Sequence, residues 1–204
     1  MSGIGDLTDE ELVLLSKNGS LDAFNRLVER HQSAVYAVTY RLLGERTAAE
    51  DATQETFIAA FRALHGFRSG SVRAWLLRIA ANQAKDQLRA RRRRPALSLE
   101  AQTSAAERTR TDTVAEDPVT AAEQRARRSA LQQALLELPF EQRAVVVLID
   151  VQGYGYEEAS RVLGEPVGTV KSRLFRARRR LRELLLAQAE LFGLEERREG
   201  RGTV

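Results

Sequence analysis

Apolar positions recur at helical spacing near the end of the chain. Successive positions of one stripe are four, three and four residues apart, and its members are Val170, Leu174, Ala177 and Leu181. That spacing places them on one face of a helix that begins at about Val167. A shorter helix is expected from about Tyr156 to Leu163. The Gly164-Glu165-Pro166 segment between them predicts a sharp turn.

The first part of the chain shows the same periodicity. Thr8 to Glu11 is a Ser/Thr-x-x-Glu capping box that opens a short helix ending at Asn18-Gly19. A longer helix should run to Gly44, with apolar positions Phe24, Leu27, Val28, His31, Val35, Val38 and Leu42. Thr47 to Glu50 predicts a second capping box, which opens a helix with a buried side of Ala49, Ala52, Thr56, Phe57, Ala60 and Leu64.

Another helix is expected after Ser71, a candidate cap, and ends in a basic run. Residues 95–122 follow with scarcely an apolar repeat, which predicts a flexible acidic linker. Beyond the linker, helices are expected from about Thr120 to Leu138 and over Glu141 to Val151. The VVVLI segment at 145–149 is the best strand candidate, but it lies within a helical repeat.

These patterns predict an all-α protein of two small helical domains joined by that linker. The domains cover 1–94 and 123–191, and 192–204 form a polar tail. The 204 residues and 43% apolar content are enough for two cores. The absence of cysteine excludes disulfides and fits a reducing compartment, and neither a signal peptide nor a membrane span is expected. We therefore expect a soluble cytoplasmic protein.

Arginine and lysine are concentrated at 85–94 and 171–182, although the formal net charge is only +4. The second cluster coincides with the predicted helix-turn-helix, whose polar face carries Thr169, Ser172, Arg173, Arg176 and Arg180, with Lys171 on its flank. A basic helix alone is most often a solvated surface. A basic helix that follows a tight turn and buries its other face indicates reading of the DNA major groove.

The first basic cluster ends a helix with a mixed face. Trp75, Asn82, Asp86 and Arg89 share one side of it. An amide can bind a base edge and arginines can hold phosphates, whereas a tryptophan is more often a core residue than a stacking platform. The preceding loop, with Phe67 and Arg68, could equally hold an unstacked base.

Asp51, Gln54 and Glu55 are three and four residues apart and form an acidic patch. Charge pattern alone favours a solvated helix face, and a docking site for a basic partner is the alternative. His31 lies on an apolar stripe without a second ligand at metal-binding spacing, so we expect a packed core histidine.

The motifs in both parts resemble the extracytoplasmic-function sigma factors, the small initiation subunits of bacterial RNA polymerase. Ala49 to Phe57 follows AED-x-x-QE-x-F, and Trp75 to Arg89 follows WL-x-x-IA-x-N-x-x-x-D-x-x-R, both typical of region 2 of that family. Leu138 to Leu148 and Leu163 to Leu181, the latter with GTVKSR-x-x-RAR, resemble region 4. The chain departs from the family pattern at Gly155, where a serine cap is usual.

The resemblance implies that Asp51, Gln54 and Glu55 bind the clamp helices of the beta-prime subunit of the polymerase core, which also includes the beta subunit. It implies promoter DNA as a second partner. The residues implied in melting and reading the minus-10 element are Phe67, Arg68, Arg73, Trp75, Asn82, Lys85, Arg89 and Arg92. Those implied at the minus-35 duplex are Thr169, Lys171, Ser172, Arg173, Arg176 and Arg180. An anti-sigma factor, often membrane-anchored, is a further implied partner.

Two other classes of function compete with this one. A stand-alone helix-turn-helix regulator would bind duplex DNA tightly without polymerase. A nucleic-acid enzyme has little support, because the sequence shows no nucleophile paired with a general base, no metal-ligand cluster and no phosphate-binding loop. No cofactor and no metal are expected.

Overall fold

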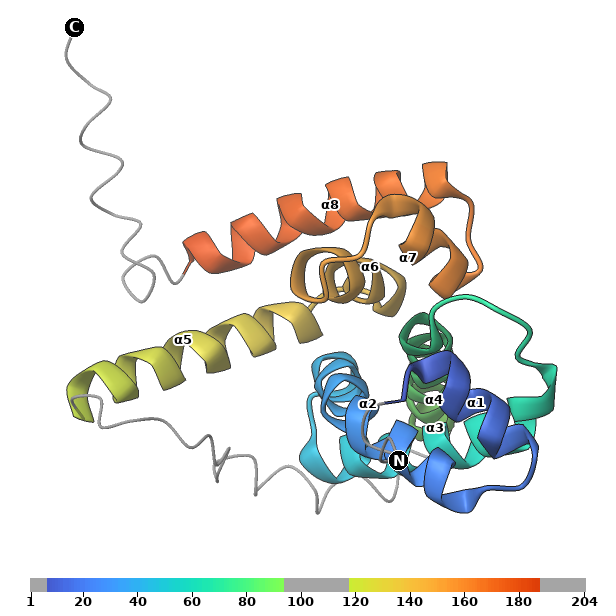
Figure 1. Ribbon diagram of the computed structural model, residues 1–204. Coiled ribbons are helices and arrows are strands. Elements are labelled where there is room, and N and C mark those ends of the chain that lie inside the picture. Colours follow the sequence, from blue (N-terminus) through green and yellow to red (C-terminus); the bar gives the residue numbers. More distant parts are fainter. Residues whose placement is uncertain (1–6, 94–117, 188–204) are drawn as a thin grey trace, which may run out of the picture.

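The computed structural model describes residues 7–93 and 118–187, and every regular element within these ranges is a helix (Figure 1). The predicted all-α class is therefore confirmed. The elements are α1 (Asp9–Lys17), α2 (Leu21–Leu43), α3 (Arg46–Ala63), η2 (Leu64–Gly66), α4 (Val72–Arg93), α5 (Pro118–Leu136), α6 (Phe140–Val146), η5 (Val147–Val151), α7 (Tyr156–Leu163) and α8 (Val167–Leu186). Residues 95–117 of the expected linker and the tail at 192–204 lie outside the described residues.

Helices α1 to α4 form the N-terminal half, and local chemistry fixes where they begin and end. The Thr8 hydroxyl accepts from the Glu11 N–H and the Glu11 carboxylate accepts from the Thr8 N–H, so the first capping box is confirmed. Gly44 ends α2 at a φ of 78°, in the left-handed region that favours glycine. Ser71 caps α4 by accepting from the Ala74 N–H at 3.1 Å.

The second predicted capping box is wrong. Helix α3 begins at Arg46, so Glu45 is the N-cap and Thr47 already lies inside the first turn. The Thr47 hydroxyl donates to the Glu45 carboxylate at 2.6 Å and does not cap the helix. The buried side of α3 was nevertheless predicted correctly, because Ala49, Ala52, Thr56, Phe57, Ala60 and Leu64 are all buried.

The C-terminal half consists of α5 to α8. Helix α5 begins at Pro118, two residues before the expected start, and Pro139 precedes α6. Residues 145–149 are helical, as expected, but the chain widens into a π-helical turn at η5. The Gln152 N–H closes that turn on the Val147 carbonyl at 3.0 Å.

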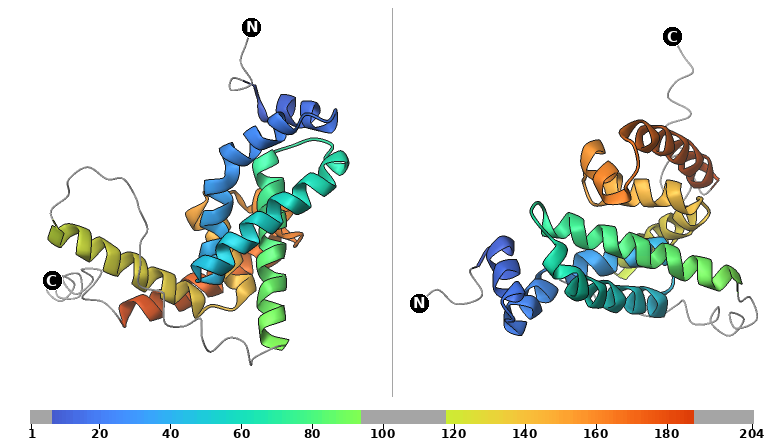
Figure 2. Two further views of the ribbon diagram at one scale, coloured as in Figure 1. Left: turned by 90° about the horizontal axis from the view of Figure 1, so that it is seen from below. Right: turned by 90° about the vertical axis from the view of Figure 1, so that its right-hand side faces the viewer.

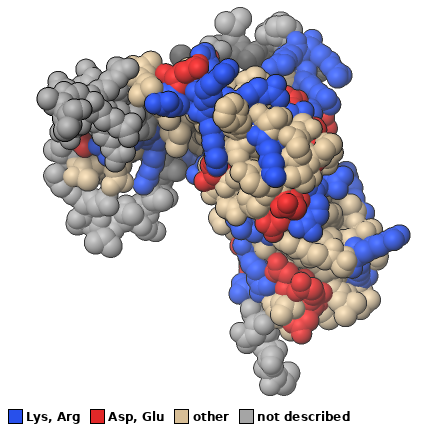
Figure 3. Space-filling model, turned by 90° about the horizontal axis from the view of Figure 1, so that it is seen from above, with Lys and Arg blue, Asp and Glu red and all other residues tan. Residues whose placement is uncertain are grey.

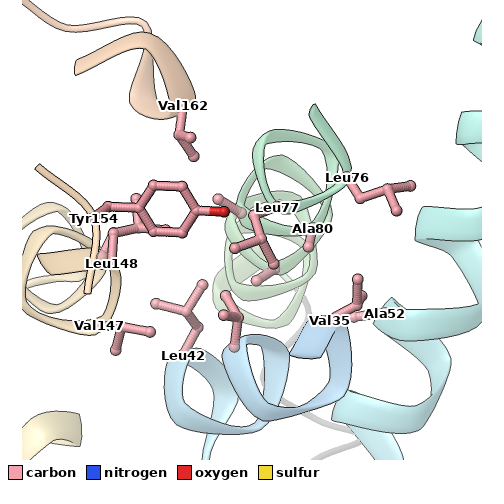
Figure 4. Close-up of a cluster of buried hydrophobic side chains, with 14 of the residues drawn as sticks. Val35, Leu42, Ala52, Leu76, Leu77, Ala80, Val147, Leu148, Tyr154 and Val162 are labelled. Atoms are coloured by element: carbon pink, nitrogen blue, oxygen red, sulfur yellow. The ribbon is translucent and has the colours of Figure 1, made fainter. Parts of the chain in front are cut away.

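The two halves pack against each other and share one apolar cluster. In Figure 4, Leu42 and Leu77 of the N-terminal half point toward Val147, Leu148 and Tyr154 of the C-terminal half. Helix α7 lies on α4, and the C-terminal end of α5 contacts the C-terminal end of α2, as the two views in Figure 2 also show. The buried side chains of both predicted domains belong to one continuous cluster among the described residues.

Polar contacts reinforce this junction. Arg143 of α6 is only 7% exposed and donates to the Leu42 carbonyl across the junction and to the Leu136 carbonyl within its own half. Burial lowers the pKa of Arg143 from its ordinary value. Gln132 of α5 also donates to the Tyr40 and Arg41 carbonyls, at 3.3 and 3.4 Å.

Candidate nucleic-acid interface

Helices α7 and α8 form the predicted helix-turn-helix. Gly164 takes a φ of 67° at the end of α7, and the Ser160 hydroxyl donates to the Glu165 carbonyl at 2.5 Å to close the turn. The Glu158 carboxylate accepts from the Gly155 N–H at 3.0 Å, which is the half of a capping box that does not need a serine side chain, and no side chain caps the first turn from Gly155. The predicted stripe of Val170, Leu174, Ala177 and Leu181 is buried, which confirms which face of α8 points inward.

The opposite face of α8 is open to solvent and strongly basic. Its exposed side chains are Lys171, Ser172, Phe175, Arg176, Arg179 and Arg180. Figure 3 views the molecule from the α8 side and shows lysine and arginine side chains spread across it. A helix with this exposed face has the shape and the charge needed to enter a DNA major groove.

The α8 residues predicted to meet DNA differ in how strongly the protein holds them. Arg176 donates to the Ser172 carbonyl at 3.3 Å and remains exposed. Arg173 pairs with Glu165 at 3.0 Å, and its side chain is only 23% exposed. Arg180 pairs with Glu183 at 3.2 Å, and Thr169 is half-buried. The Arg173 guanidinium is therefore free to contact another molecule only after it leaves Glu165 or shares it.

Phe175 was missed by sequence reasoning, which placed Arg179 only on the flank of this face. Phe175 is 70% exposed, which is unusual for an aromatic side chain, and Arg179 is exposed beside it. The signal was present in the sequence, because Phe175 and Arg179 lie three and seven residues after Ser172 and so share its face. By contrast, Asp150 holds Arg178 through two hydrogen bonds of 2.5 and 3.1 Å, which raise the pKa of Arg178.

The loop before α4 and the start of α4 form an aromatic pair. The rings of Phe67 and Trp75 are 5.0 Å apart between centroids, and Phe67 is only 9% exposed. Trp75 packs against the core while remaining partly exposed, which agrees with the expectation of a core role. Arg68 is exposed, and Lys17 fixes the loop by donating to the Phe67 carbonyl. In this arrangement Trp75, rather than Phe67, offers an aromatic surface at the edge of the loop.

Two predicted DNA-binding residues of α4, Arg73 and Lys85, contact the C-terminal half. Lys85 pairs with Glu141 of α6 at 3.3 Å, and the Arg73 guanidinium donates to Gln152 at 2.6 Å and lies 5.5 Å from the Tyr154 ring. Partial burial opposes ionisation of Glu141, but its own backbone N–H and Lys85 together lower its pKa below the ordinary value. Asn82 and Lys85 line a shallow hollow with Arg173 of α8.

The end of α4 is uniformly basic and exposed. Arg89 pairs weakly with Asp86 at 3.6 Å, Arg91 pairs with Glu45 of the α3 N-cap at 2.7 Å, and Arg92 is exposed. Such side chains suit the phosphates of a nucleic-acid backbone.

The acidic patch lies on α3, away from the α8 face. Asp51, Gln54 and Glu55 are all exposed. Two exposed apolar side chains, Ile58 and Phe61, continue the same side of the helix. A carboxylate patch bordered by apolar surface is suited to a basic protein partner.

The described residues contain no cluster of histidine, cysteine and carboxylate groups that could hold a metal ion. His31 is buried and its Nε2 lies 2.8 Å from the Asp9 carboxylate, which confirms the expected packed histidine. Within the same ranges, no helix has the length and hydropathy needed to cross a membrane.

Comparisons with known proteins match both halves. The family profile of Sigma-70 region 2 matches residues 27–94, and that of Sigma-70, region 4 matches residues 128–181. The ECF RNA polymerase sigma factor SigM of Mycobacterium tuberculosis is 36% identical over 184 residues, covering 90% of this chain and 87% of that protein. SigE of Mycolicibacterium smegmatis is 40% identical over 168 residues, covering 81% of this chain but only 63% of that protein.

A solved structure is similar over most of the chain as well. The sigma factor RpoE from Bartonella quintana, crystallised with the anti-sigma factor NepR, matches with a TM-score of 0.61 and 30% identity. The match covers 81% of this chain and 98% of that one.

Proposed function

Because the chain belongs to the extracytoplasmic-function (ECF) sigma factors of the sigma-70 family, we propose that it binds RNA polymerase core and directs it to specific promoters. The observation that carries this proposal is the presence of both regions, in order, each with an exposed surface of the appropriate chemistry. Its task is recognition rather than catalysis. The match of the N-terminal half to region 2 disfavours a stand-alone regulator, which would not need that half.

Region 4 is proposed to read the minus-35 duplex through α8. Arg176 and Ser172 lie on the exposed face of α8, where a guanidinium can bind a guanine bidentately and a hydroxyl can bind a base or a phosphate. Phe175 can contact a thymine methyl group. We assign Lys171, Thr169 and Arg180 to phosphates, with Arg173 joining them once it parts from Glu165.

Region 2 is proposed to capture the minus-10 element as an opened strand. Extruding a base costs a few kcal/mol, so stacking and amide contacts must compensate. Trp75 and the exposed amide of Asn82 can supply these contacts, while Arg89 and Arg92 hold the backbone. Phe67, only 9% exposed, packs against the Trp75 ring with the ring centroids 5.0 Å apart.

The polymerase core is proposed to dock on α3. The exposed Asp51, Gln54 and Glu55 are suited to the basic clamp helices of the beta-prime subunit, and the beta subunit completes the core. Since polymerase and promoters are cytoplasmic, we place the chain there. RpoE of Bartonella quintana was crystallised with an anti-sigma factor, and we propose a partner of that class for this chain.

Run-off transcription with purified core enzyme and genomic fragments tests the proposal. The chain should confer selected start sites, and Asp51→Lys/Glu55→Lys should abolish both co-purification with core and transcription. Glu29→Lys/Glu137→Lys is the matched control, because it reverses two exposed carboxylates, one on α2 and one in the turn after α5. If the doubly reversed α3 variant retains its far-ultraviolet circular dichroism and still co-purifies with core, the docking assignment is wrong.

A further inference from the structure

Helix α1 lies outside both matched family profiles, because the region 2 profile begins only at residue 27. The helix nevertheless packs against η2, which leads into the loop before α4, the loop proposed to lie beside an extruded base of the minus-10 element. Figure 2 shows α1 and this part of the chain side by side. The region 2 match therefore does not account for what α1 contributes to the loop.

One lysine of α1 makes a polar contact with the loop. Lys17, the last residue of the helix, is half-buried, and its Nζ donates to the carbonyl of Phe67, fifty residues further along the chain. The Phe67 N–H donates to the Leu64 carbonyl at 3.1 Å, so both backbone polar groups of Phe67 are bonded. The Phe67 ring, 9% exposed, packs against Trp75 at 5.0 Å between centroids. Phe67 is therefore the residue that attaches the loop to the protein.

The rest of the loop faces solvent. Residues 68–70 are exposed, and Gly70 takes a φ of 105°, in the left-handed region that favours glycine. The Ser71 hydroxyl accepts from the Ala74 N–H at 3.1 Å and fixes the end of the loop to α4. The exposed residues are thus held between two anchors, and the anchor at Phe67 uses a side chain supplied by α1.

Helix α1 is itself held firmly enough to act as a support. The Asp9 carboxylate in its first turn accepts from Arg30 of α2 at 2.7 Å and lies 2.8 Å from Nε2 of the buried His31. Leu12 and Val13 bury the inner face of the helix. A hydrogen bond from an ammonium group is roughly twice as strong as a neutral one, so a lysine on such a support is suited to fixing a loop carbonyl.

From these contacts we infer that Lys17 is a positioning residue for capture of the minus-10 strand. Through the Phe67 carbonyl it holds the loop beside Trp75 in the shape that accepts an unstacked base, and this role rests on the proposed function of region 2. Lys17 acts through the loop, because its Nζ is directed at a backbone carbonyl of the protein itself. Without the bond, the cost of ordering residues 68–70 is added to the cost of binding the strand.

Three variants separate the hydrogen bond from the charge. Lys17→Met keeps a long unbranched side chain but removes the donor, and Lys17→Arg restores a donor. Arg62→Met is the matched control, because it removes one positive charge from an exposed position of α3 that is close in sequence to the loop. Far-ultraviolet circular dichroism and urea unfolding verify that each variant is folded, and Lys17→Gln replaces the methionine variant if that one unfolds.

The first measurement uses the chain alone. Trp75 is the single tryptophan of the sequence and packs against Phe67, so its fluorescence reports on the anchored end of the loop. In Lys17→Met, acrylamide should quench Trp75 more strongly and the amides of residues 68–70 should exchange faster with deuterium, while those of α1 keep their wild-type rates. Lys17→Arg and Arg62→Met should behave as wild type. An unchanged loop would overturn the inference, and faster exchange confined to α1 would assign Lys17 to the end of its own helix.

The second measurement uses holoenzyme and a promoter fragment selected by run-off transcription, with the non-template strand of its minus-10 element left unpaired. Lys17→Met should bind this fragment about tenfold more weakly, which is the effect of losing one hydrogen bond from a charged group, and Lys17→Arg should recover most of the loss. Binding of a duplex that contains only the minus-35 element should not change. Equal losses in Lys17→Met and Arg62→Met would overturn the positioning role, because charge alone would then explain both. A loop that loosens as described, in a chain that never directs core enzyme to a start site, would support the anchor and refute the proposed function alone.

Discussion

The arginines of α8 are not equivalent, although the sequence presents them as one basic run. Glu165 holds Arg173, Asp150 holds Arg178 and Glu183 holds Arg180. Arg176 has only contacts within its own helix, to Ser172. The sequence predicted the polar face correctly, but not the pairs of Arg173 and Arg178, because these depend on where the fold places Glu165 and Asp150, whereas Arg180 and Glu183 are a local pair three residues apart.

Arg176→Ala tests the role of the exposed guanidinium. Loss of a bidentate contact to a guanine should cost about 1 to 3 kcal/mol at one base pair of the minus-35 element and little elsewhere. Competition binding with single-base variants of the promoter, using holoenzyme, measures this discrimination. Arg180→Ala is the matched comparison and should weaken binding to all sequences similarly, with a smaller salt dependence. A uniform loss for Arg176→Ala would make it a phosphate contact.

Among the helices, turn chemistry decided most boundaries and also explains the one wrong cap. Thr8, Ser71 and Gly44 act as predicted, since each is the residue type that its position requires. The capping box predicted at Thr47 is wrong because the motif alone does not show which residue is the N-cap. Glu45 does so, with extended backbone angles, and the Thr47 hydroxyl then bonds to its side chain.

Gly44 and Gly153 provide a matched test of packing between α2 and α5. Both have nearly the same backbone angle, with φ of 78° and 76°, so alanine should strain each by a similar amount. A Cβ at Gly44 would collide with Leu136 of α5, whereas a Cβ at Gly153 meets open space. Gly44→Ala should therefore lower the free energy of unfolding by about 1 to 3 kcal/mol more than Gly153→Ala. Urea unfolding of both variants measures the difference, and equal losses would show that α5 does not press on this turn.

For the complete chain, periodicity revealed the helices but not the union of the two halves. Leu42, Leu77, Val147 and Leu148 fit the apolar stripe of their own helices, so nothing in the spacing marks them as residues shared between regions. The junction joins positions about a hundred residues apart in sequence, as in the bond from Arg143 to Leu42. Contacts of that kind depend on relative orientation, which a single sequence does not encode in any local pattern.

The Lys85–Glu141 pair gives the junction a pH dependence whose sign is fixed. Because the pKa of Glu141 is lowered in the folded protein, the pair stabilises the packing of the halves above the ordinary glutamate range. That contribution is lost as the pH falls through the lowered pKa, so a chain carrying donor and acceptor dyes at Glu29→Cys and Glu183→Cys should show less energy transfer below the ordinary glutamate range. Lys85 and Arg173 are the cations that lower this pKa.

Glu141→Gln should remove this pH dependence. The free energy that the pair contributes to the packing of the halves is less than about 1 kcal/mol, because the pair is largely solvated. Resonance energy transfer between dyes at positions 29 and 183 is measured against pH in the wild-type background and in Glu141→Gln. Identical curves for wild type and Glu141→Gln would show that the pair does not contribute to the packing of the halves.

The last carbonyls of α2 are bonded from the other half of the molecule. Tyr40 and Arg41 accept from Gln132, and Leu42 accepts from Arg143. A helix end of this kind normally depends on water or on its own cap for those groups. Separation of the halves removes these bonds and leaves only the Gly44 N–H on the Tyr40 carbonyl as a cap. The final turn of α2 should then fray, and its amide hydrogens should exchange with deuterium well before those in the middle of the same helix.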